Sequence, residues 1–177
     1  MSEHETIKKV KSKQGILVKI QNFITLGYST KEDLRELDKK LRDFIYEDLR
    51  RSRRRWADIY LEALNETVAL SGEKFKKIIQ VLDRLMEKVR HADYGYAGLM
   101  DRKGHIRENE LARVLNHDKA LSVDVDEVTQ IIDKIYSKME DEDWTTISSD
   151  VKNVKTLLLA FEAKFRQREE KYRPFEV

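Results

Sequence analysis

The chain contains no cysteine, one proline and only six glycines among its 177 residues. Without cysteine it cannot form disulfide bonds, thiolate zinc sites or iron–sulfur clusters, and it has no cysteine nucleophile. Proline and glycine are the residues that most often interrupt helices. Their scarcity therefore favours long, uninterrupted helices.

Several sequence signals of function are also absent. No apolar run approaches the length that spans a bilayer, and the first residues lack the apolar core of a signal peptide. The glycine-rich motifs that bind phosphates and the glycine–serine motif of hydrolases do not occur. We therefore expect a cytoplasmic protein that does not bind membranes, has no cofactor and is not an enzyme.

The sequence is rich in charge. Charged residues make up 38% of the chain, and the 35 Lys and Arg nearly balance the 33 Asp and Glu, so the total does not indicate a strongly basic nucleic-acid-binding protein. The charges are unevenly placed, however. Residues 1–27 contain five lysines and two glutamates, whereas residues 118–150 contain ten acids and three lysines. Such separation suits complementary contacts between copies or with a partner.

One stretch has a long helical pattern. Ser29 and Glu32 have the spacing of a capping box, and no glycine or proline follows until Gly72. Apolar residues recur between them at steps of three and four. The pattern predicts one very long helix over about residues 30–70, which would be roughly 60 Å long. A compact chain of this size is only about 40 Å across, so the helix would overhang its own domain.

The other helical patterns are shorter, and no segment alternates as a strand does. They predict helices over residues 15–26, 73–91, 107–117, 124–140 and 149–165. The predicted fold is therefore all-α, with about six helices, in a helical bundle with a smaller C-terminal helical part. The glycine-containing loop 91–105 is the predicted boundary between an N-terminal part, 1–90, and a C-terminal part, 106–177, although both could form one domain.

Arginines crowd the middle of the predicted long helix. They could bind an anion or an acidic partner, because guanidinium groups beside an aromatic ring suit phosphates and carboxylates. The alternative is a solvated helix face, because acids such as Glu47 lie one turn away. The candidate binding residues are Arg50, Arg51, Arg53, Arg54, Arg55 and Trp56.

The same helix suggests self-association. Its apolar stripe is longer than any other predicted helix, and a second antiparallel copy would supply the same stripe in reverse. The predicted contact residues are Leu41, Ile45, Leu49 and Trp56.

Metal chemistry has weaker signals. His91, His105 and His117 fall close together beside acids, but none belongs to the Glu-x-x-His motif of di-iron bundles. Residues 99–110 resemble the second half of an EF-hand loop, yet Leu99 and Lys103 occupy positions that need oxygen ligands. We therefore predict no metal site.

The function predicted from the sequence is that of a non-enzymatic helical binding protein. Its expected partner is a second copy, as a homodimer, or another protein. A nucleic-acid-binding protein using the cluster Arg50–Arg55 is the alternative, and a metal-dependent helical-bundle enzyme is the second alternative.

Overall fold

The computed structural model describes residues 3–26, 31–65, 72–92 and 108–172, and nearly all of them are helical. This confirms the all-α fold class. The helices are α1 (Glu3–Leu26), α2 (Lys31–Asn65), α3 (Gly72–His91), α4 (Glu108–Glu140) and α5 (Trp144–Tyr172).

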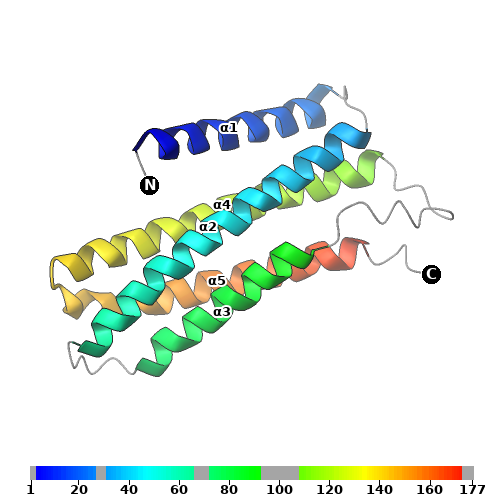
Figure 1. Ribbon diagram of the computed structural model, residues 1–177. Coiled ribbons are helices and arrows are strands. Elements are labelled where there is room, and N and C mark those ends of the chain that lie inside the picture. Colours follow the sequence, from blue (N-terminus) through cyan, green and yellow to red (C-terminus); the bar gives the residue numbers. More distant parts are fainter. Residues whose placement is uncertain (1–2, 27–30, 66–71, 93–107, 173–177) are drawn as a thin grey trace.

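The helices form a four-helix bundle with a fifth helix on one edge (Figure 1). The pairs α2–α3 and α4–α5 are antiparallel, and they pack side by side with α2 against α4 and α3 against α5. Ser52 contacts Thr129 and Arg55 contacts Asp133, so α2 and α4 run parallel. Helix α1 packs against α2 and α4, antiparallel to both.

The prediction of six helices is wrong for the described residues, where there are five. Residues 116–123 had the polar pattern of a connector, but they continue α4 without a break. The physical reason is that two of their polar residues, Asp118 and Ser122, are buried in the bundle. Arg168 of α5 binds Asp118, so a charged side chain occupies a core position of the helix.

Helix α2 does not stand out by its length. It has 35 residues, against 33 in α4 and 29 in α5, so the prediction of one exceptionally long helix is not confirmed. Residues 66–70, which the prediction included, lie outside the described residues. Helices α4 and α5 are long enough to lie along the whole bundle, as Figure 1 shows.

Two other helices begin earlier than predicted. Helix α1 begins at Glu3 and passes through Gly15, which the prediction took as a helix start. Gly15 faces open space, where a Cβ would meet nothing, so no close packing requires a glycine there. Helix α5 begins at Trp144, directly after a tight turn. Helix α3 lies close to its predicted range of 73–91.

All five helices contribute side chains to one hydrophobic core. Residues of the predicted N-terminal and C-terminal parts are therefore neighbours, since α2 packs along α4 and α3 along α5. The predicted boundary loop, 91–105, lies outside the described residues from position 93 onward. Polar contacts add to the core, as Arg84 and Lys88 of α3 both donate hydrogen bonds to Glu162 of α5.

Helix α1 brings together the opposite charges seen in the sequence. Lys13 donates hydrogen bonds to Asp48 of α2 at 3.0 Å and to Asp126 of α4 at 2.6 Å. Ile16 and Ile20 are buried on the same face of α1. Part of the basic N-terminal region thus meets part of the acidic region within one chain.

Candidate functional site between α2 and α3

Two arginines of the predicted cluster join α2 to its neighbours. Arg53 donates a hydrogen bond to Asp83 of α3 at 2.9 Å. Arg55 pairs with Asp133 of α4, and its guanidinium lies 5.6 Å from the ring centre of Tyr136. These two side chains leave α2 towards different helices, so the arginines do not form one continuous patch.

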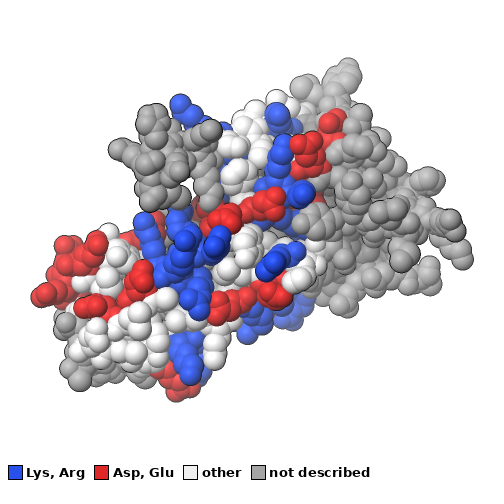
Figure 2. Space-filling view, in the orientation of Figure 1, with Lys and Arg blue, Asp and Glu red and all other residues white. Residues whose placement is uncertain are grey.

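The other three arginines stay near α2 itself. Arg50 lies 3.5 Å from Glu47, and Arg51 lies 3.9 Å from Asp48. Arg54 is exposed, and among the described residues no ion pair involves it. In the view of Figure 2, Lys and Arg side chains gather over the middle of the molecule, with acidic side chains among them. Much of the charge on the cluster is therefore balanced within the chain.

Trp56 lies inside the protein. Its side chain is fully buried, its ring stacks on Phe75 with centroids 5.5 Å apart, and its Nε1–H donates a hydrogen bond to the Phe75 carbonyl at 3.0 Å. In this position Trp56 holds α2 against α3, and its ring is not available to stack on a ligand.

The residues predicted for self-association are also in the core. Leu41, Ile45, Leu49 and Trp56 all have 0% exposure. The premise of an uncovered apolar stripe is not met, because α3 and α4 cover it within one chain. Self-association itself stays a prediction, and it would need another surface.

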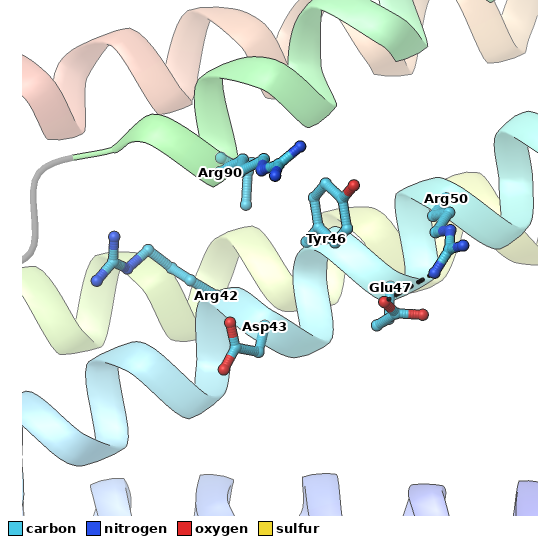
Figure 3. Close-up of a pocket in the computed structure, with 7 residues that line it drawn as sticks. Arg42, Asp43, Tyr46, Glu47, Arg50 and Arg90 are labelled. Carbon is cyan, nitrogen blue, oxygen red and sulfur yellow. Dashed lines mark ion pairs between the residues drawn. The ribbon is translucent and has the colours of Figure 1, made fainter.

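A groove of about 500 Å³ lies between α2 and the end of α3. Most of its lining comes from one face of α2, and α3 supplies the opposite wall (Figure 3). Three of the lining side chains are arginines, two are acids, one is an aromatic residue and one is apolar: Arg42, Asp43, Tyr46, Glu47, Arg50, Val89 and Arg90.

The arginines give this groove its chemical character. Arg90 of α3 is exposed, and no ion pair of the described residues involves it. Arg50 is half exposed and reaches Glu47 only at 3.5 Å, a distance beyond a good hydrogen bond. Tyr46 contributes an aromatic surface between the charges, whereas Val89 is almost completely buried. The groove can therefore bind a group that combines a negative charge with some apolar surface.

Sequence reasoning found one of these arginines and missed two. Arg50 belongs to the predicted cluster, but Arg42 and Arg90 were not singled out. Arg90 lies forty residues from Arg50, and only the antiparallel packing of α3 on α2 brings the two to one groove. No spacing in the sequence reports that contact.

The floor of the groove continues into a buried charge network. Arg42 donates hydrogen bonds to Asp38 at 2.7 Å and to the Ala92 carbonyl at 2.6 Å. Arg168 of α5 donates to Asp38 at 3.2 Å and to both carboxylate oxygens of Asp118 at 2.8 and 2.9 Å. The four charged side chains are nearly fully buried, and they join α2, α4, α5 and the end of α3.

Burial has a marked effect on one carboxyl group of this network. Desolvation raises the pKa of Asp118 to about 7, while Arg168 opposes the shift and the neighbouring Asp38 adds to it. The unfolded chain loses this proton near pH 4, whereas the folded chain holds it until about pH 7. The contribution of Asp118 to stability therefore falls as the pH rises through this range.

We predict that Asp118→Asn removes this pH dependence. Asparagine stays neutral, so the variant should gain stability relative to wild type between pH 4 and pH 8, by about 1.4 kcal/mol or more. Urea unfolding at each pH measures the difference, and the comparison cancels the titration of groups shared by both proteins. Glu162 behaves in the opposite way: Arg84 lowers its pKa to about 2, so its contribution to stability is lost as the pH falls from about 4.5 towards 2. A difference that stays constant with pH would contradict the prediction.

The described residues contain no group of three His, Asp or Glu side chains placed to hold a metal ion. His105 and its acidic neighbour Asp101 lie outside the described residues. No described helix is long and apolar enough to cross a membrane. No family model, no curated protein and no solved structure matches the chain.

Proposed function

We propose that the protein is a non-enzymatic helical binding protein that takes an anionic segment of a protein partner into the groove between α2 and α3. The observation that carries the proposal is that Arg50 of α2 and Arg90 of α3 line the same groove, with Tyr46 between them. Arginine binds carboxylates through a planar fork, and tyrosine supplies contact area at low conformational cost. The bundle below holds both walls in place.

The charge of the groove favours a carboxylate over a nucleic-acid backbone. Asp43 and Glu47 line the same groove and partly offset its arginines, which suits one or two carboxylates better than a long chain of phosphates. Arg53 and Arg55 are already paired with acids of α3 and α4, so few cations of the cluster face a shared ligand. Nucleic-acid binding through the cluster is therefore the less favoured proposal.

We predict that a fluorescein-labelled deca-glutamate peptide binds the protein and that Arg50→Gln with Arg90→Gln weakens this binding at least tenfold. Each lost charge-assisted hydrogen bond costs about 1.5–3 kcal/mol when its partner is desolvated. Fluorescence anisotropy at low salt measures the dissociation constants.

The matched control is Arg113→Gln with Lys152→Gln, which removes two exposed positive charges from α4 and α5, away from the groove. This variant should bind the peptide nearly as wild type does. If the control variant and the groove variant bound the peptide equally weakly, binding would reflect general charge attraction, and the proposed site would be contradicted. The nucleic-acid alternative would be favoured if the protein bound single-stranded DNA more tightly than the peptide. In that case, replacing Arg53 and Arg54 with Gln should weaken DNA binding too.

A further inference from the structure

The turn between α4 and α5 carries an exposed cluster of acids at one end of the bundle. Glu140, Asp141 and Glu142 are exposed, and among the described residues no ion pair involves them. Figure 2 shows acidic side chains gathered at the end where Figure 1 places this turn. The turn is thus an exposed negative surface at one end of the bundle.

The backbone of this turn is held in one conformation. Glu142 has a φ of 59°, in the left-handed region that often ends helices. The amide groups of Asp141, Glu142 and Asp143 donate hydrogen bonds to carbonyls of the last turn of α4, at 2.9–3.1 Å. A carboxylate cluster on such a backbone loses little conformational freedom when it binds, which favours association.

Part of this acidic cluster is placed where it does not help its own helix. Asp143 directly precedes α5 and suits the positive end of that helix, but Glu140 and Asp141 lie at the negative end of α4. Acids at a helix C-terminus are mildly unfavourable for the helix.

We infer that the occupant of the groove is this acidic turn of a second copy of the chain. The inference rests on the proposed function, because it assigns a partner to the same groove. The charges are complementary: Glu140 and Asp141 would meet Arg50 and Arg90 of the other copy. Both surfaces are preformed, since the groove walls are rigid helices and the turn is hydrogen-bonded.

The groove and the turn lie too far apart to meet within one chain. The groove lies level with Asp126 of α4, because Lys13 joins that residue to Asp48 of α2. Along α4, Glu140 is about fourteen residues away, or roughly 20 Å. Because helices hold both surfaces in place, the turn that enters the groove has to come from a second copy. A pair in which each turn enters the other copy's groove makes two equal contacts, which strengthens a small interface.

The test uses charge reversal on either side of the contact. Arg50→Glu with Arg90→Glu reverses the groove, and Glu140→Lys with Asp141→Lys reverses the turn. Sedimentation equilibrium at low salt should show wild type dimerising with a dissociation constant of roughly 10–100 µM, as suits a small polar interface. Each reversed variant alone should stay monomeric. An equimolar mixture of the two should form a heterodimer, because both contacts regain opposite charges.

The control reverses two exposed charges elsewhere, Arg113→Glu with Lys152→Glu, and should dimerise as wild type does. Circular dichroism checks that every variant is folded. A wild-type mass that stays at 21.0 kDa over the whole concentration range would overturn the inference, as would a mixture that stays monomeric. If the deca-glutamate peptide still binds the groove of such a monomer, the proposed function stands and another acidic protein is the occupant. If wild type stays monomeric and the peptide does not bind either, both proposals are rejected.

Discussion

Replacing Arg168 with methionine is expected to lower the free energy of unfolding by about 3–5 kcal/mol, because it leaves the buried carboxyl group of Asp118 without its cation and removes one of the two cations that bind Asp38. Arg168 is 1% exposed and donates hydrogen bonds to Asp118 and Asp38, which are buried as well. Methionine has a similar length and keeps much of the packing. Urea unfolding at pH 7, followed by circular dichroism, measures the change.

Arg166 provides the matched control, since it lies two residues earlier on α5 and is exposed. Arg166→Met should change stability by less than about 0.5 kcal/mol. Adding Asp118→Asn to Arg168→Met should recover part of the loss, because it removes one uncompensated charge and leaves the Asp38–Arg42 pair. Equal, small effects at positions 166 and 168 would show that the buried network contributes little.

Replacing Trp56 with alanine is expected to cost about 3–5 kcal/mol of stability, through lost burial and a large cavity between α2 and α3. The indole is fully buried, stacks on Phe75 and donates a hydrogen bond to its carbonyl. Trp56→Phe keeps the aromatic ring and loses the N–H donor, so it should cost less, about 1–2 kcal/mol. Thermal and urea unfolding measure both variants.

The other tryptophan separates this effect from a general cost of removing an indole. Trp144 is only half-buried at the start of α5, so Trp144→Ala should destabilise clearly less than Trp56→Ala. Deca-glutamate binding should survive in folded Trp56→Phe, because Trp56 does not line the groove. Loss of peptide binding in that variant would mean that Trp56 contributes to the site, as the sequence first suggested.

The sequence alone was enough to predict an all-helical protein. The period of its apolar residues and the scarcity of glycine and proline act locally, and the structure has helices in nearly all the residues it describes. Helix α3 shows this most clearly. Its buried side chains recur on one face, and its bounds lie within about one residue of the predicted ones. Local patterns determine local structure in this chain because each helix buries a continuous stripe.

Tertiary structure decided where the polar residues belong. Asp118 looked like part of a connector, yet Arg168, fifty residues later, makes it a core residue of α4. Trp56 looked like part of a binding surface, yet Phe75 of α3 encloses it. Arg50 and Arg90 line one groove only because α3 folds back along α2. A charged or aromatic side chain can face solvent, a ligand or a buried partner at the same helical spacing, so the packing of distant helices chooses among these environments.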